Sequence, residues 1–238
     1  MIKNKSFLIA IFLMTILLLS GCSNNENEEL LAQKDEEINQ LNKEVEELNK
    51  KLKDLEQELE ETDNMDKYKN NEVLLRALET INYLKNKDME GLASVVHPLM
   101  GVRFTPYEHI DLQNDLVFTK DRITTFLEDT QEYTWGSFDG SGEPIVMTFS
   151  EYFDRFIYDV DFANPHMIGN NYSIGKGNSL NNISEAYPDA YFIEFHFTGF
   201  EPEYEGMDWR SLRLVYEKMD GVWYLVGIVH GEWTIWLQ

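Results

Sequence analysis

Residues 209–230 read Trp-Arg-Ser-Leu-Arg-Leu-Val-Tyr-Glu-Lys-Met-Asp-Gly-Val-Trp-Tyr-Leu-Val-Gly-Ile-Val-His. Two segments rich in β-branched and aromatic residues, 209–218 and 222–230, flank Asp220-Gly221. A two-residue Asp-Gly loop between such segments is a strong signal for a β-hairpin. Residues 190–198 alternate aromatic side chains along their length and predict a third strand. The end of the chain is therefore predicted to be an antiparallel sheet.

The register of this hairpin decides which side chains share a face. With a type I′ turn and Met219 opposite Val222, the core face takes Leu212, Leu214, Tyr216, Trp223, Leu225, Gly227 and Val229. The opposite face then takes Arg213, Glu217, Tyr224, Ile228 and His230. A slip of one residue would invert the assignment, because side chains alternate with a period of two.

The polar face of the hairpin is the candidate ligand-binding site. Charged groups inside the concavity of a sheet are costly unless they are paired or used, whereas on a convex, wet face they cost nothing. On a concave face, Arg213 is the strongest candidate to hold an anionic or carbonyl group, because its planar fork favours bidentate contacts. Glu217, Tyr224 and His230 complete the set on this face. Arg213→Ala is then expected to abolish ligand retention and to leave the thermal midpoint within a few degrees.

Glu194 and His196 join the candidate ligand-binding residues because they are two positions apart on the strand predicted over 190–198. They project to the same face, as an acid–base pair or as a hydrogen-bonded pair facing solvent.

Upstream of the sheet, apolar periodicity and capping residues predict short helices and strands. The expected helices cover 72–86, 89–96 after Asp88, 119–129 after Thr119, and 150–159 after Ser150. Short strands are expected at 101–104, 132–138 and 145–148, and 161–188 is expected to be a long surface loop. Together these elements predict an α+β head domain over 65–238, with short helices packed on a curved antiparallel sheet.

A heptad pattern precedes the head. Of ten a and d positions between 31 and 62, eight are apolar: Leu31, Ile38, Leu41, Val45, Leu48, Leu52, Leu55 and Leu59. Ile, Val and Leu at a with Leu at d favour a parallel dimer, although a trimer and a single solvated helix with i,i+4 ion pairs stay open. Residues 23–64 are therefore predicted to be a tether and coiled-coil stalk, which makes a homo-oligomer through residues 30–62.

The N-terminus contains a targeting signal. Lys3 and Lys5 precede an apolar segment, 7–19, which is short for a membrane span but suits a secretory signal peptide. The segment ends in Leu19-Ser20-Gly21-Cys22, which holds the only cysteine of the chain and resembles the lipobox of bacterial lipoproteins. The resemblance implies that residues 1–22 are a lipoprotein signal peptide and that Cys22 carries the lipid anchor. The protein is then expected at the extracytoplasmic face of the cell membrane.

Two further resemblances concern the head. Residues 84–92 are similar to the helix–turn–helix opening of the nuclear transport factor 2-like superfamily, and 222–228 are similar to its closing strand. This resemblance implies a cone-shaped fold. The segments His97-Pro98, 101–104, 135–137, 139–144 and the C-terminal half resemble uncharacterised lipoproteins of Gram-positive bacteria, a family that brings no established chemistry. The predicted helix around 120–129 and the 160–188 loop depart from a minimal cone and leave a different α+β fold open.

Composition excludes several classes of function. The chain has 238 residues and a formal net charge of −23, which argues against nucleic acid, whose phosphates require a basic surface. With Cys22 acylated, no thiol remains for a disulfide. The Asp139–Glu143 segment lacks the ligand spacing of a calcium loop, and the five histidines lack zinc-ligand spacing. No metal site and no cofactor are predicted.

Catalysis finds weak support in the sequence. The carboxylates of 199–208 could serve glycoside chemistry, but acidic loops are usually solvated. Ser137, Ser141 and Ser211 lack a nucleophile-elbow context. The favoured function is a non-enzymatic binding module presented on a coiled-coil spacer. The alternatives are a cell-envelope hydrolase acting on glycan or peptide through carboxylates with His97 or His230, and an assembly partner acting through the coiled coil.

Overall fold

A computed structural model describes the backbone of residues 3–177 and 179–234 and the side chains of 28–55, 57, 71–177 and 179–234. The side chains of the predicted signal peptide, Cys22 included, lie outside this set. The chain divides into two compact units, residues 1–64 and 65–238, and each is described by itself.

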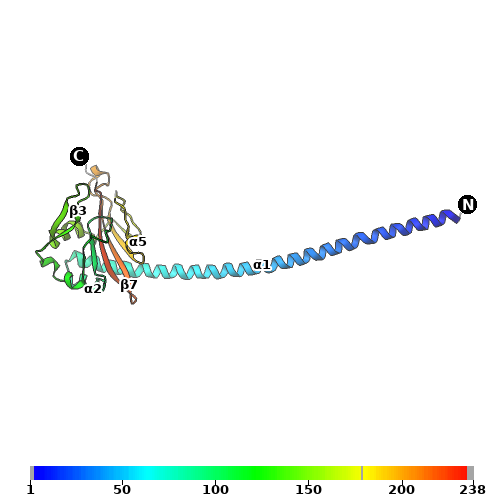
Figure 1. The fold of residues 1–238 in the computed structure, drawn as a ribbon, viewed down its shortest axis with the longest axis horizontal. Coiled ribbons are helices and arrows are strands. Elements are labelled where there is room, and N and C mark those ends of the chain that lie inside the picture. The colour runs from blue at the N-terminus through cyan, green and yellow to red at the C-terminus, as the bar shows by residue number, and fades with distance from the viewer. Residues whose placement is uncertain (1–2, 178, 235–238) are drawn as a thin grey trace. The chain divides into compact units, whose positions relative to one another are not determined.

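Figure 1 labels several of the elements. The helices are α1 (Lys3–Lys85), α2 (Met89–Val95), α3 (Lys120–Ile123), α4 (Phe149–Tyr152) and α5 (Ile183–Ala186), with the 3₁₀ turns η1 (Phe126–Glu128) and η3 (Pro202–Tyr204) and the π-helical turn η2 (Phe153–Ile157). The strands are β1 (Val102–Thr105), β2 (Val117–Phe118), β3 (Glu132–Ser137), β4 (Pro144–Thr148), β5 (Met167–Asn170), β6 (Tyr191–Phe197), β7 (Arg210–Met219) and β8 (Val222–Glu232).

The head contains a six-stranded open sheet in the order β2-β1-β8-β7-β6-β5 and a separate β3–β4 hairpin. The predicted class, a long N-terminal helix followed by helices and a largely antiparallel sheet, is confirmed. One pair departs from the prediction, because β1 runs parallel to β8, with Phe104 opposite Ile228. This parallel pair places the first strand of the head beside the last one, in the interior of the open sheet.

The Asp220-Gly221 hairpin forms with Met219 opposite Val222, as predicted. A β-bulge then shifts the register, since Tyr216 faces Leu225 and the next residue along β7, Val215, faces Gly227. Val226 is the extra residue of β8. Beyond it every side chain of β8 lies on the face opposite to the one predicted, as the two-residue period of a strand requires.

The main core lies on one face of the sheet and is rich in aromatic rings. Phe104 on β1 makes edge contacts with Phe149 and Tyr152, and Trp135 on β3 stacks on Tyr152 with ring centroids 4.0 Å apart. The fully buried Trp135 satisfies its indole N–H by donating to the Met147 carbonyl at 2.9 Å. A smaller apolar cluster of Ile110, Ile183, Tyr187, Val215, Val226 and Val229 includes side chains from the opposite face of the β7–β8 hairpin. The sheet is therefore covered on both faces.

Helix boundaries differ from the sequence-based expectation in two places. Asp88 caps α2 as predicted, since its side chain accepts from the Gly91 N–H. The helix expected after Ser150 instead begins after Thr148, which forms a capping box with Glu151. The helix expected over 119–129 is two short turns, α3 and η1. The 161–188 segment, expected to be a loop, also contains β5 and α5.

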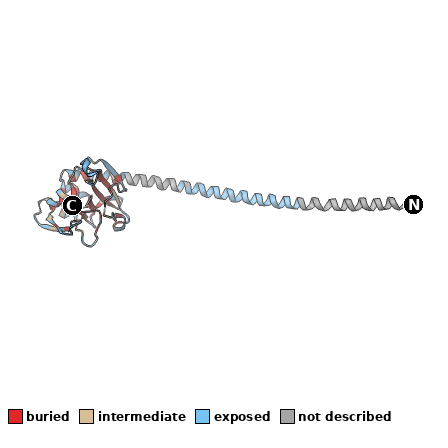
Figure 2. Cartoon of the chain, turned by 90° about the horizontal axis from the view of Figure 1, so that it is seen from above, coloured by how far each residue is buried: buried red, intermediate tan, exposed pale blue. Residues whose placement is uncertain are grey.

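In the N-terminal unit, the described side chains of α1 are exposed all along residues 28–55 (Figure 2). Within the described part of the chain, no helix is both long enough and apolar enough to cross a membrane.

Candidate functional site

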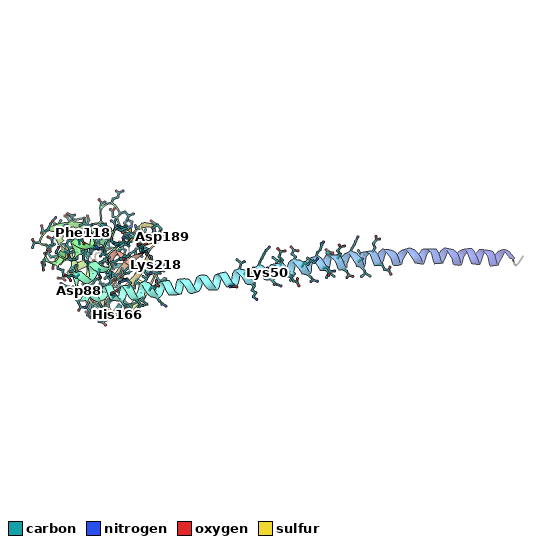
Figure 3. The ribbon with its side chains drawn as sticks, turned by 90° about the horizontal axis from the view of Figure 1, so that it is seen from below. Lys50, Asp88, Phe118, His166, Asp189 and Lys218 are labelled. Carbon is teal, nitrogen blue, oxygen red and sulfur yellow. The ribbon has the colours of Figure 1, made fainter. Side chains whose placement is uncertain are left out.

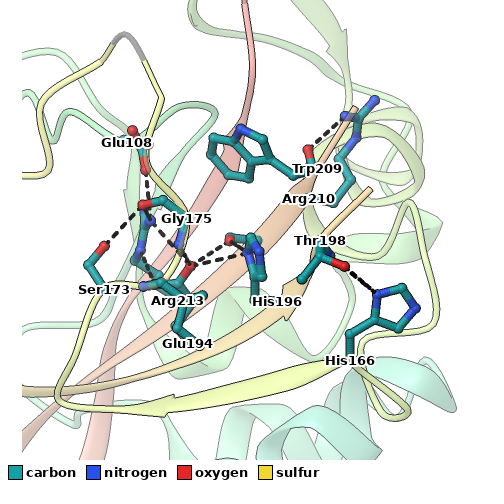
Figure 4. Close-up of polar contacts among 12 residues, drawn as sticks. Glu108, His166, Ser173, Gly175, Glu194, His196, Thr198, Trp209, Arg210 and Arg213 are labelled. Atoms are coloured by element: carbon teal, nitrogen blue, oxygen red, sulfur yellow. Dashed lines mark hydrogen bonds and ion pairs between the residues drawn. The ribbon is translucent and has the colours of Figure 1, made fainter. Parts of the chain in front are cut away.

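A cluster of buried polar side chains lies on the face of β6 and β7 opposite the aromatic core (Figure 4). Arg213 on β7 pairs with Glu194 on β6, and Arg213 Nε donates to Glu194 Oε2 at 3.0 Å. A second carboxylate, Glu108, follows β1 and accepts from Arg213 Nη2 at 2.7 Å. All three side chains are buried. The Arg213 guanidinium already contacts two carboxyl groups. An anionic ligand would therefore be repelled by an excess of negative charge at this cluster.

The pKa values of the two carboxyl groups are shifted in opposite directions. Burial acts to raise the pKa of Glu194, but the Arg213 guanidinium, the Ser211 hydroxyl and the Gly175 N–H hold it below its ordinary value. Burial raises the pKa of Glu108 above its usual range, against the opposing effect of Arg213. Glu194 is therefore the permanent negative partner of Arg213, and Glu108 is the first of the pair to take a proton.

Ser211 and His196 resemble a nucleophile and its base but are not arranged as one. The Ser211 hydroxyl lies 2.5 Å from Glu194 Oε1 and 2.7 Å from His196 Nδ1. An ionised carboxylate only accepts, so Ser211 donates its proton to Glu194 and His196 Nδ1–H donates to Ser211. The serine hydroxyl therefore donates to the Glu194 carboxylate and not to the imidazole, and it is fully buried. This arrangement braces the sheet and does not activate a nucleophile.

The cluster fastens a segment of chain, residues 173–177, over the sheet; we call it the strap. Glu194 accepts the N–H groups of Ile174 and Gly175 at 2.9 and 2.8 Å, and Arg213 Nη2 donates to the Gly175 carbonyl at 3.3 Å. Glu108 accepts the N–H of Gly177. Three buried charged side chains therefore position the strap through its backbone.

Five of the six residues predicted to bind a ligand do share one face: Glu194, His196, Arg213, Glu217 and Tyr224. His230 does not, because the bulge at Val226 places it opposite Leu212 on the aromatic-core face. The placement of His230 beside Arg213 was therefore wrong. Arg213 does not reach solvent, and none of the six lines either of the two hollows described below.

His230 belongs to a separate network of charges on the aromatic-core face. Its Nε2 lies 3.4 Å from Asp159, which also accepts from Arg210 Nε at 3.1 Å. Arg210 lies 3.3 Å from Glu232, and Glu232 accepts from Arg155 at 2.6 Å. Burial acts to raise the pKa of Asp159, but His230 and the two arginines lower it overall. These alternating charges tie η2 to the ends of β7 and β8.

A polar cleft of about 630 Å³ opens on the head. It lies between the β1–β2 connection and the β3–β4 hairpin and is lined by Pro106, Tyr107, His109, Asp111, Asn114, Asp115, Thr134, Gly136, Ser137, Asp139, Pro144 and Ser179. The lining contains three aspartates and no lysine or arginine. Asp139 Oδ2 accepts from Ser179 at 3.0 Å and Thr234 at 3.1 Å, which fixes the carboxylate in the wall.

Asp115 is the most perturbed carboxyl of the cleft. Its Oδ2 accepts from the Thr105 hydroxyl at 2.8 Å and from the Asp111 N–H at 2.9 Å. Burial raises the pKa of Asp115 to about 6, and these hydrogen bonds oppose the rise. Among the described residues, none donates to its second oxygen, Oδ1. At neutral pH the cleft therefore holds a partly buried negative charge, which the nearby Arg103 guanidinium, 3.0 Å from the Asp115 carbonyl oxygen, offsets only in part.

A second hollow of about 400 Å³ shares His109 and Asp111 with the cleft. Its other lining residues are Ile110, Leu112, Gln113, Asn182, Glu185 and Ala186. Asn182 ties this wall to the β1–β2 connection, because its amide accepts from the Ile110 N–H at 2.8 Å and donates to the Ile110 carbonyl at 3.0 Å. Ser179 and Asn182, which line the two hollows, follow the strap in the sequence.

The other sequence motifs form turns and loops. Asp139–Glu143 forms a turn between β3 and β4, and no group of three or more His, Cys, Asp or Glu side chains in the described residues is placed to hold a metal ion. The carboxylates of 199–208 lie on an exposed loop containing η3. His97 is buried and its Nδ1 accepts from the N–H groups of Leu99 and Met100, which makes it a cap of that turn.

The sequence did not point to the cleft, because its carboxylates come from connections and not from periodic elements. A usable signal was the density of Asp and Asn over 109–115, which the prediction passed over. Comparison with family models, curated proteins and solved structures finds no match for this chain.

Proposed function

We propose that this chain is a lipid-anchored lipoprotein of the extracytoplasmic membrane face, which presents a non-enzymatic binding domain on a coiled-coil spacer. The observation that carries the binding role is the acidic cleft of the head. Ligand sites are concave and use a small number of convergent polar groups to fix the orientation of the ligand. The described residues around it offer fixed carboxylates and no activated nucleophile, which suits recognition.

The anchor and the spacer rest on the N-terminal part of the chain. The apolar segment 7–19 followed by the single Cys22 supports export and acylation. An acylated cysteine needs no membrane-spanning helix. The helical residues 28–55 carry the heptad pattern, which supports a spacer between the membrane and the head. We also infer a variant of the nuclear transport factor 2-like cone, supported by the N-terminal helices and the long terminal hairpin.

The charge of the cleft selects the ligand class. Asp111, Asp115 and Asp139 line it without a lysine or arginine, and the neighbouring Arg103 supplies one positive charge for three carboxyls, so a cationic ligand would complete the balance of charge. An anionic ligand would meet repulsion in a partly desolvated site, where charge interactions are stronger than in water. A ligand bearing primary amines or guanidinium groups is therefore the chemical complement of this cleft.

Calorimetry with tetralysine tests this assignment, with fully acetylated tetralysine as the neutral probe. Asp115→Asn and Asp139→Asn should each weaken binding by about tenfold at pH 7.5, equivalent to ~1.4 kcal/mol. Glu203→Gln removes the same charge from the exposed loop outside the cleft and serves as the matched control. Equal losses in all three variants would show non-specific attraction to an acidic protein and would contradict the cleft as the site.

One observation favours a second function, a cell-envelope hydrolase. A carboxyl with a pKa of about 6, Asp115, stands in the same cleft as Asp139, and glycoside hydrolysis uses one protonated and one ionised carboxyl. Release of reducing sugar from purified cell-wall glycan, abolished by Asp115→Asn, would support this function. Absence of release by the unmodified protein between pH 5 and 7 would leave the binding role.

A further inference from the structure

An apolar stripe without a partner runs along the described part of the N-terminal unit. The heptad residues Leu31, Ile38, Leu41, Val45, Leu48, Leu52 and Leu55 are each more than half exposed, between 52% and 65%. Their spacing of three and four residues places them on one side of α1. Apart from Ala32, the positions between these residues carry charged or amide side chains, so the stripe has the form of a helix–helix interface with a polar rim.

The flanking charges distinguish the possible partners, because e and g residues set orientation in a coiled coil. In a parallel, in-register pair of this chain, each g residue faces the e residue five positions later on its partner. Glu37 and Glu44 then face Asn42 and Asn49, and Lys51 faces Glu56. This arrangement contains two attractive contacts, Lys51 with Glu56 in both directions, and two like-charged contacts, Glu58 with Asp63 in both directions, at the end of the heptads.

An antiparallel pair of the same length has more repulsive than attractive charge contacts. With a positions packed against d positions, g residues face g residues and e residues face e residues. Glu44 meets Lys51 favourably, but Glu37 meets Glu58 and Asp35 meets Glu56. Each contact occurs twice, which gives four repulsive contacts against two attractive ones. The parallel pair therefore has the smaller excess of repulsive contacts. Lys34, at the first d position, lies at an end of the heptads, where its ammonium reaches solvent and pairs with Glu37 at 2.8 Å.

We propose that α1 pairs with α1 of a second copy of this chain, in parallel and in register, so that two heads are carried at the same end of one stalk. The inference rests on the coiled-coil part of the proposed function and deepens it by naming the partner. It makes the molecule bivalent, with two acidic clefts for one ligand. A cationic ligand with repeated amines would then bind more tightly than a single cleft allows, by avidity.

Disulfide trapping of the full-length chain in membrane vesicles tests orientation and register together. Ile38→Cys and Leu55→Cys are each produced alone and are also produced together in one membrane as a mixture, then oxidised and separated without reductant. A parallel, in-register pair cross-links each variant to itself and yields no mixed product. Lys50→Cys, labelled in Figure 3 and at the f position of the heptad, opposite the a and d residues, is the matched control and should cross-link at least tenfold less. The unmodified chain sets the background from Cys22.

The outcomes separate the alternatives. Cross-linking only in the mixture of Ile38→Cys and Leu55→Cys would replace the parallel pair with an antiparallel one, and no cross-linking above the unmodified chain would overturn self-association. Sedimentation of the Glu56→Lys variant in detergent gives a second measurement. In a parallel dimer the new lysine would face Lys51, and the dimer should weaken several-fold. In an antiparallel dimer it would face Asp35, and the dimer should become stronger. Tetralysine binding is measured on the same samples. Loss of pairing with binding intact would refute this inference alone, and pairing without binding would refute the cleft alone.

Discussion

Arg213 on β7 lies directly opposite Glu194 on β6, with Arg213 Nε 3.0 Å from Glu194 Oε2 and both side chains wholly buried. The pair faces the strap, and Glu194 holds two of its backbone N–H groups. A buried ion pair contributes little net stability compared with apolar side chains, but removal of one partner leaves an uncompensated charge. The pair therefore acts as a structural brace between the sheet and the strap.

The first prediction concerns Arg213→Ala. The change leaves Glu194 and Glu108 buried without their cation, and we expect a loss of about 3–5 kcal/mol of unfolding free energy. Urea denaturation followed by tryptophan fluorescence measures it. Lys218→Ala, on the same strand, removes an exposed pair with Glu72 and should cost less than ~1 kcal/mol. An Arg213→Ala protein within a few degrees of the unmodified thermal midpoint would return Arg213 to the ligand-binding role predicted from the sequence.

The second prediction concerns the strap. A Cβ at Gly175 would lie 2.7 Å from Ser211 Oγ and 2.8 Å from the Trp209 ring, closer than real contacts allow. We expect Gly175→Ala to displace the strap and to cost roughly 1–3 kcal/mol, as overpacking does. Hydrogen exchange at Ile174 should accelerate, because its bond to Glu194 is broken. Lys176→Ala, exposed on the same segment, should change neither quantity.

Much of the fold could be predicted from the sequence because short-range interactions determine it. The Asp220-Gly221 turn, the Asp88 cap and the aromatic alternation of β6 each act within a few residues. The side of the sheet on which His230 lies could not be predicted, because the bulge at Val226 depends on how β8 packs between β1 and β7. A single extra residue reversed the assignment of every side chain after it.

The cleft could not be predicted either, because it also depends on tertiary packing. Asp115 and Asp139 are 24 positions apart in non-periodic connections, and only the tertiary fold brings them to one hollow. The buried role of Arg213 depended on the strap, whose path over the sheet is set by Glu194 and Glu108. The prediction treated the strap region as surface, and therefore assigned its partners to a ligand.

The third prediction concerns the anchor. If Cys22 is acylated, Cys22→Ala should abolish incorporation of labelled fatty acid and should leave the signal peptide uncleaved. Labelling and gel mobility after membrane fractionation measure both effects. Ser23→Ala, the adjacent residue, should leave both unchanged. Unaltered labelling of the Cys22→Ala protein would remove the basis for a lipid anchor at this position.

The fourth prediction concerns pH and Asp115. Burial raises the folded-state pKa of this carboxyl to about 6 from an ordinary value of 3.8. Between these values the folded protein holds a proton that the unfolded chain releases, so the contribution of Asp115 to stability falls as pH rises through this window. Above pH 6 the full cost of the buried charge is present. Asp115→Asn should therefore stabilise the protein at pH 7 by about 1–2 kcal/mol, allowing for partial solvent exposure.

The measurement is the difference in unfolding free energy between Asp115→Asn and the unmodified protein from pH 4 to pH 7.5. It should be near zero at pH 4 and reach its maximum above pH 6. Asp111→Asn is the matched control, because hydrogen bonds from Asn114 and Gln113 lower the pKa of Asp111, and its ionised form supports the same connection. That variant should lose stability at pH 7. A pH-independent difference for Asp115→Asn would show that the carboxyl titrates normally, and the protonated acid that the hydrolase alternative requires would then be absent.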